Sequence, residues 1–234
     1  MADADPIVFA SRQFSSRVPR PLWIGVGTVA LVFGGLALIA VRYYLQGVAI
    51  REINAVGGSV ETRPRWPDWL KERLGDERLR PYDEPIHARL SYSRARDETL
   101  GQLHRLPGLK RLDCNATRIS DAGLVHLRDM TSLEWLWIAG TPVTDSGLAE
   151  LKGLTRLREL GLNGTRVTDA GLVHLQGMTE LRELWLNETG ITDAGLVHLK
   201  DLTGLAWIFV RGTQVSDEGI TELKRALPAL QIGR

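Results

Sequence analysis

Two adjacent stretches, Leu157–Glu180 "LRELGLNGTRVTDAGLVHLQGMTE" and Leu181–Gly204 "LRELWLNETGITDAGLVHLKDLTG", are nearly the same 24-residue sequence. A fixed period of this length is the signature of a stacked repeat array, in which the terminal units are atypical. We therefore expect one repeat domain over residues 85–234. Its units, the first of them degenerate, start near residues 85, 109, 133, 157, 181 and 205.

Each unit has two halves with different periodicity. The opening L-x-x-L-x-L alternates as a strand does, whereas the leucines of D-x-G-L-x-x-L-x-x-L are three residues apart, as in a helical or 3₁₀ segment. One unit has too few apolar side chains to fold alone, so stacking must bury both of its sides.

The full pattern, L-x-x-L-x-L-x-x-T-x-[VI]-[ST]-D-x-G-L-x-x-L, resembles the leucine-rich repeat of the ribonuclease-inhibitor-like class, in the "TDAGL" form of bacterial repeat proteins. It is similar as well to the repeats of F-box-type substrate receptors, although residues 46–84 leave no room for an F-box. The resemblance covers Pro85 to about Ile232. It implies an α/β solenoid with a curved parallel sheet on the concave side, helices on the convex side, and recognition without catalysis.

The sequence departs from the usual Asn or Cys of the leucine-rich repeat by placing threonine at that position. The threonine hydroxyl must then satisfy the backbone of the turn. These residues are Thr117, Thr141, Thr165, Thr189 and Thr213.

The helical half of the unit carries a recurrent Asp followed two residues later by Gly. We expect the Asp, with the Ser or Thr before it, to cap the first helical turn, and the Gly to allow close packing between units. The acids are Asp97, Asp121, Asp145, Asp169, Asp193 and Asp217, of which Asp97 follows Arg96 in place of Ser or Thr and lacks the Gly. A second position reads His126, Glu150, His174, His198 and Glu222. Because these side chains belong to separate helices, we expect them to be solvated and to form no metal site.

The exposed face of the strands carries the variation between units. Alternate side chains of a strand point to the same side, so the third, fifth and seventh residues of each unit are expected on the concave face. Four of the seven tryptophans fall there, and an aromatic patch of this size typically marks a partner site. The predicted binding residues are Trp135, Trp137, Glu159, Gly161, Glu183, Trp185, Trp207, Phe209 and Arg211.

In this pattern Gly161 lies on the strand between those of Trp137 and Trp185. The strands of the two tryptophans are about 9–10 Å apart, which is two strand spacings. Two alternatives follow. Either an open notch remains for one aromatic side chain or sugar ring, or the two indoles lean over Gly161 and fill the gap.

Glu159 and Glu183 are expected on adjacent strands, roughly 5 Å apart, which is the separation in a retaining glycosidase. An open sheet face neither excludes water nor raises the pKa of one carboxyl selectively. We therefore interpret the pair as attracting a basic group of a ligand, or as leaning toward Arg158 and Arg182.

The sequence contains no Ser/His/Asp array, phosphate loop or Cys-x-x-Cys, and Cys114 falls at a buried strand position. We expect no enzyme and no cofactor.

The charge distribution excludes a nucleic-acid-binding protein, because the net charge is +1 and no basic face is concentrated. Arg63 and Arg65, for example, are followed by Asp76 and Asp83, a mixture that predicts a solvated surface.

An uncharged run of twenty residues, Leu22–Val41, has the length of a bilayer-spanning helix. We expect a transmembrane helix over residues 22–45, preceded by a cytoplasmic tail of residues 1–21. A cleaved signal peptide is the alternative, although its apolar region is normally shorter. Arginines are more frequent before the run than after it, which favours extracytoplasmic repeats. A possible dimer interface within the span consists of Gly27, Ala30, Gly34 and Ala37.

Residues 46–84 are expected to form a juxtamembrane segment and N-terminal cap, with a strand at Ser59–Thr62. A short amphipathic helix should carry Trp66, Trp69, Leu70 and Leu74. We interpret this helix as a packed lid; a helix lying on the membrane surface is the alternative.

Together these patterns predict a membrane-anchored recognition module that binds a protein segment or a glycan on its concave face. Three rival interpretations remain. One is a self-associating envelope scaffold, one is an adaptor in protein turnover by analogy with F-box receptors, and one is a glycoside hydrolase that uses Glu159 and Glu183.

Overall fold

The protein divides into two compact units, at residues 1–41 and 42–234. The structure, a computed structural model, describes residues 20–79 and 83–234, with residues 20–36 described by their backbone alone. Of the first unit it describes the start of helix α1 (Arg20–Ala55), which continues into the second unit.

The predicted membrane span falls largely outside the described side chains. The tail of residues 1–19 and the side chains of Gly27, Ala30 and Gly34 are not described, and Ala37 is exposed. In the described part of the chain, no helix is both long enough and apolar enough to cross a membrane.

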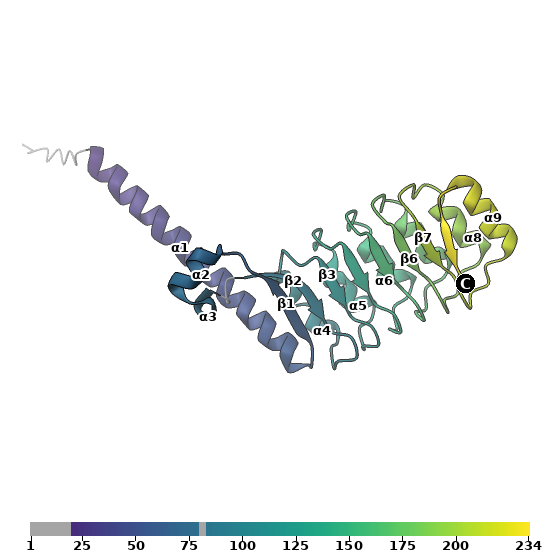
Figure 1. The fold of residues 1–234 in the computed structure, drawn as a ribbon, viewed down its shortest axis with the longest axis horizontal. Coiled ribbons are helices and arrows are strands. Elements are labelled where there is room, and N and C mark those ends of the chain that lie inside the picture. The colour runs from purple at the N-terminus through teal and green to yellow at the C-terminus, as the bar shows by residue number, and fades with distance from the viewer. Residues whose placement is uncertain (1–19, 80–82) are drawn as a thin grey trace, which may run out of the picture. The chain divides into compact units, whose positions relative to one another are not determined.

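A sheet of eight strands, counted over the described residues, forms the second unit, with the strands in sequence order (Figure 1). The strands are β1 (Ser59–Arg63), β2 (Glu84–Arg89), β3 (Arg111–Asp113), β4 (Trp135–Trp137), β5 (Glu159–Gly161), β6 (Glu183–Trp185), β7 (Trp207–Phe209) and β8 (Gln231–Gly233). The first two pair antiparallel, and every later neighbour is parallel with a constant offset of 24 residues.

Helical segments connect successive parallel strands and lie on one side of the sheet. The α-helices are α4 (Asp97–Leu100), α5 (Asp121–Leu124), α6 (Asp145–Leu151), α7 (Asp169–Leu172), α8 (Asp193–Leu196) and α9 (Asp217–Ala226). Short 3₁₀ segments are η2 (Leu103–Arg105), η3 (Val125–Leu127), η4 (Val173–Leu175) and η5 (Val197–Leu199). The two predicted halves of each unit are thus confirmed.

The leucines of the repeat form one continuous buried core between the sheet and the helices. The threonine prediction is also confirmed, because each threonine hydroxyl donates to the backbone carbonyl three residues earlier. The donors are Thr117, Thr141, Thr165, Thr189 and Thr213, at 2.6–2.7 Å from their acceptors.

The N-terminal end of the core is covered by α1 and β1. Ala49 and Ile53 of α1 are fully buried in the core, and β1 pairs along β2. The predicted strand at Ser59–Thr62 is therefore present, and it closes the edge of the sheet.

Two predictions for this region are wrong. Asp83, expected in a solvated surface, is only 6% exposed. Its carbonyl accepts from Gln46 Nε2 at 2.8 Å, and its carboxylate accepts from the Arg65 backbone N–H at 3.3 Å.

The predicted lid helix is α2 (Asp68–Leu74), followed by α3 (Asp76–Leu79), but no residue of α2 is buried and Trp69 is 64% exposed. The helix forms without acting as a packed lid.

Candidate functional site

The helices lie on one side of the sheet and leave its other face uncovered (Figure 1). The strand register places two rows of residues across the sheet. The first row consists of His87, Arg111, Trp135, Glu159, Glu183, Trp207 and Gln231. The second row consists of Arg89, Asp113, Trp137, Gly161, Trp185, Phe209 and Gly233. The parallel register aligns the members of each row strand by strand.

The second row contains a continuous aromatic stack. Trp137 lies directly against Gly161, where an added Cβ would come 2.5 Å from Trp137 Cε3. The ring centroids of Trp137 and Trp185 are 5.3 Å apart with an interplanar angle of 48°, and Trp185 stacks on Phe209 at 3.6 Å and 12°. The gap over Gly161 is therefore filled by the leaning indoles, and the open notch is the wrong alternative.

The stack buries one polar atom. The indole Nε1 of Trp185 is inaccessible to solvent and has no hydrogen-bond partner among the described residues. A buried N–H without a partner is unfavourable, so the stacking geometry is maintained by apolar contact and not by hydrogen bonding at this atom.

The first row combines aromatic and acidic side chains. Arg111 places its guanidinium carbon 4.2 Å from the centre of the Trp135 ring. Glu159 and Glu183 are directly paired in the strand register, as predicted, and both are half-buried. Trp207 follows them, 43% exposed, with its ring 6.0 Å from Phe209 and nearly parallel to it.

The two glutamates differ from the acids around them. Among the residues whose side chains the structure describes, neither Glu159 nor Glu183 has a hydrogen-bond or ion-pair partner, so the predicted lean toward Arg158 and Arg182 is not found. Arg158 instead approaches Glu134 at 3.6 Å and Glu180 at 3.7 Å.

Glu134, the residue before β4, is by contrast an acid with basic partners. It accepts a hydrogen bond from Lys110 Nζ at 2.8 Å. That hydrogen bond and the positive charges of Lys110, Arg158 and Arg156 lower the pKa of the Glu134 carboxyl, against the opposing effect of desolvation. The chain therefore pairs Glu134, the acid directly before β4, with basic side chains and leaves Glu159 and Glu183 without such partners.

The N-terminal end of the open face is ion-paired. His87 Nε2 lies 3.0 Å from Asp113 Oδ2, and His87 Nδ1 lies 3.6 Å from Glu61 Oε2. Arg89 donates to Glu61 at 2.9 Å. This ionic end was missed because Glu61 comes from β1, outside the repeat; the sequence gives no register for its pairing with His87.

The seventh residue of each unit, predicted on the exposed strand face, lies just after the strand. The strands contain only three residues, and the asparagines that follow them accept hydrogen bonds from the backbone N–H of the next unit. These bonds run from Ala139 to Asn115, from Asn187 to Asn163 and from Arg211 to Asn187, at 2.8–2.9 Å. Arg211 therefore lies in the turn after β7 and outside both rows.

The recurrent Asp of the helical half has a different role from the predicted cap. The N-cap residue is the preceding Ser or Thr in every unit after the first, where it is Arg96, and in three units the hydroxyl accepts a first-turn N–H. The Asp carboxylate binds the next unit instead: Asp169, for example, accepts from the Thr192 backbone N–H and hydroxyl, both at 2.7 Å. The interpretation of the Asp as a cap is wrong.

The Gly of the same motif makes room for this link. A Cβ at Gly195 would come into collision with Asp169 Oδ1, and the other units repeat the arrangement. The prediction that this Gly allows close packing between units is confirmed. We refer to the Asp, the next Ser or Thr and the next Gly as the inter-repeat latch.

The histidines of the helical half and Cys114 do not come together as a reactive centre among the described residues. His126 is exposed, and His198 Nδ1 lies 3.3 Å from the Gln176 side-chain amide. No cluster of three potential metal ligands occurs among the described residues. Cys114 is fully buried as predicted, and burial, with a smaller contribution from Asp113, raises the pKa of its thiol strongly.

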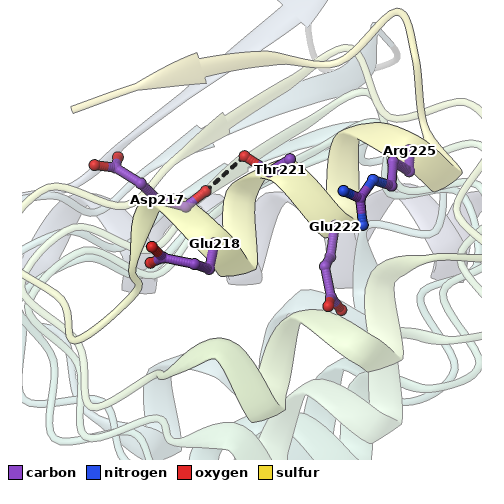
Figure 2. A pocket seen from close by; sticks show the side chains of 5 residues that line it. All are labelled: Asp217, Glu218, Thr221, Glu222 and Arg225. Carbon is purple, nitrogen blue, oxygen red and sulfur yellow. Dashed lines mark hydrogen bonds between the residues drawn. The ribbon is translucent and has the colours of Figure 1, made fainter.

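A hollow of about 250 Å³ lies on the outer side of α9 (Figure 2). Its lining residues are Asp217, Glu218, Thr221, Glu222 and Arg225, and all five are exposed. The Thr221 hydroxyl donates to the Asp217 carbonyl at 2.8 Å, which is a local helix contact. The hollow is a solvated depression and contains none of the aromatic residues of the two rows.

Comparison with known proteins identifies the architecture. No protein-family model and no curated protein matches the chain. Among solved structures, the internalin inlF of Listeria monocytogenes is 21% identical over 57% of this chain and 36% of its own, with a TM-score of 0.50. The fold is a leucine-rich-repeat solenoid. Internalin C2 of the same organism is 25% identical over 56% of this chain and 55% of its own, with a TM-score of 0.47.

The leucine-rich-repeat chain thus spans 36% and 55% of the lengths of these two proteins. At this level of identity the likeness establishes the fold alone. What the solenoid binds must be argued from its own surface.

Proposed function

We propose that the protein is a membrane-anchored leucine-rich-repeat module that binds a protein segment on the open sheet face and has no catalytic role. The observation that carries this proposal is the concentration of large aromatic side chains on one uncovered face, with Trp207 43% exposed. Aromatic residues of this kind dominate the energetics of protein interfaces. The proposed binding residues are Trp135, Glu159, Glu183 and Trp207, supported from the second row by Trp137, Trp185 and Phe209.

The closed stack favours a protein segment over a glycan. A sugar ring would have used the notch over Gly161, which Trp137 fills. An extended chain needs no such slot, because it lies along the face and places successive side chains on the first row. No contact in the described part of the chain favours the scaffold, the turnover adaptor or the hydrolase.

A displayed peptide library tests this proposal on the full chain in detergent. We expect enriched peptides whose binding is lost with Trp207→Ala or Trp135→Ala. Trp69→Ala is the control, because Trp69, at 64% exposed against 43% for Trp207, is more accessible but lies outside the repeats. Enrichment of no peptide, or of peptides that bind both face variants normally, would overturn the proposal. Light scattering on the same sample reports the oligomeric state. An oligomer that buries Trp207 would favour the scaffold.

The membrane anchor is a proposal that rests on the uncharged run of residues 22–41. We propose that residues 22–45 span the bilayer and that the repeats are extracytoplasmic. Protease added to intact cells should then digest the repeats, whereas protection of the repeats until lysis would reverse the orientation.

A further inference from the structure

The acidic pair on the first row, Glu159 and Glu183, has no basic partner on the open face among the described residues. At the N-terminal end of that face the acids Glu61 and Asp113 have basic partners within 3.6 Å. Glu159 and Glu183 have none among the described residues, although both are half-buried. Two like charges paired directly across neighbouring strands destabilise the sheet. A cation bound between them would remove that repulsion.

The first row already contains one contact between a cation and an indole ring. The guanidinium of Arg111 lies over Trp135 at 4.2 Å. Trp207 is on the opposite side of the acidic pair, adjacent to Glu183 in the register, and no described cation lies over it. Its ring is fixed nearly parallel to Phe209. Trp207 therefore offers a positioned aromatic face beside two free carboxylates.

We propose that Trp207, Glu183 and Glu159 form a binding site for an arginine side chain of the bound protein segment. This inference rests on the proposed function, because it names the chemistry that the open face recognises. A guanidinium stacks on an aromatic ring and donates hydrogen bonds to carboxylates through its planar N–H groups, whereas a lysine ammonium is compact and more strongly hydrated. A divalent cation is a poorer occupant, because it needs more oxygen ligands than two carboxylates usually supply.

The probe is an acetylated and amidated peptide of alternating serine and arginine, titrated against the full chain in detergent by calorimetry. Two further peptides replace arginine with citrulline, which has the same shape without charge, or with lysine. We expect saturable binding of the arginine peptide, at least about 10-fold weaker binding of the citrulline peptide and weaker binding of the lysine peptide. Binding of the arginine peptide should also weaken as salt is added.

Variants of the protein locate the site. Glu183→Gln is expected to weaken binding of the arginine peptide about 5- to 10-fold, and the double change with Glu159→Gln more. Binding of the citrulline peptide should not change. Glu218→Gln is the matched control, because it removes the same charge from the exposed surface of α9.

The outcomes separate this inference from the proposed function. Equal binding of arginine and citrulline peptides, equal binding of arginine and lysine peptides, or an arginine preference that survives both glutamine changes would overturn the arginine site. So would the absence of any saturable binding of the arginine peptide. The proposed function would still stand if library peptides depended on Trp207 without depending on arginine. Because the citrulline and salt comparisons leave the protein unaltered, they remain decisive even if a variant folds poorly.

Discussion

Gly161 is the residue that allows the aromatic stack to form. Any larger side chain would displace the Trp137 ring that lies against it. We expect Gly161→Ala to lower the free energy of unfolding by about 1–3 kcal/mol, as for an overpacked core position. The near-ultraviolet circular dichroism of the tryptophans should change as well. Gly177→Ala is the control, because a Cβ there has no neighbour within 4 Å; an equal loss in that variant would contradict the explanation.

Glu188 occupies a left-handed backbone conformation that favours glycine. Its φ is 57°, and the equivalent residues one unit away on either side are Gly164 and Gly212, with φ of 62° and 68°. We expect Glu188→Gly to raise the free energy of unfolding by about 1 kcal/mol, because the Cβ strain is removed. Gly164→Ala should lower it by a similar amount in the same urea titration. Stabilisation by both changes, or by neither, would refute the assignment of strain to this position.

At the scale of the element, the inter-repeat latch between Asp193 and Ser216 makes the stack sensitive to acid. The Ser216 hydroxyl and backbone N–H donate to Asp193 and lower the pKa of its carboxyl. A carboxyl whose pKa is lower in the folded state stabilises the fold above its unfolded pKa of about 4, and this contribution disappears as pH falls through the folded value.

We therefore expect the urea midpoint of the protein to fall as pH is lowered below about 4. Ser216→Ala removes the larger of the two causes, so its midpoint should be lower at neutral pH and should change less between neutral and acidic conditions. Thr221→Ala is the control, because that hydroxyl contacts only the Asp217 carbonyl. An unchanged acid dependence in Ser216→Ala would rule out this latch as its source.

The strand half of each unit could be predicted more completely than the helical half. Period and alternation together place Trp137, Glu159 and Glu183 on adjacent strands, because a parallel register with a constant offset leaves no freedom in their alignment. They do not show that Asp169 contacts Thr192, since this contact depends on how closely two units approach. Nor do they show in which direction Trp137 leans, because an indole at this position has space on either side until its neighbours are placed.

At the scale of the whole molecule, the repeat fold does not begin where the repeats begin. Ile53 lies in α1, yet it is fully buried in the repeat core. A side chain at Gly58 would meet both Ile53 and Leu90, so α1, the start of β1 and the first unit pack together. β1 also covers the edge of β2. The core that the six units share is thus completed by residues that have no repeat pattern.

This arrangement predicts that residues 42–234 form a cooperatively folding fragment and that residues 85–234 do not. Without α1 and β1, the fragment 85–234 exposes Leu90 and an unpaired strand edge, which favours aggregation. Its urea transition should be broader and lower. Within the fragment 42–234, Ile53→Ala should cost about 2–4 kcal/mol as a large-to-small core change. Leu45→Ala, at an exposed position of the same helix, should cost much less. If 85–234 unfolded with the same midpoint and cooperativity as 42–234, the end of α1 would be dispensable and the repeat units alone would suffice for the fold.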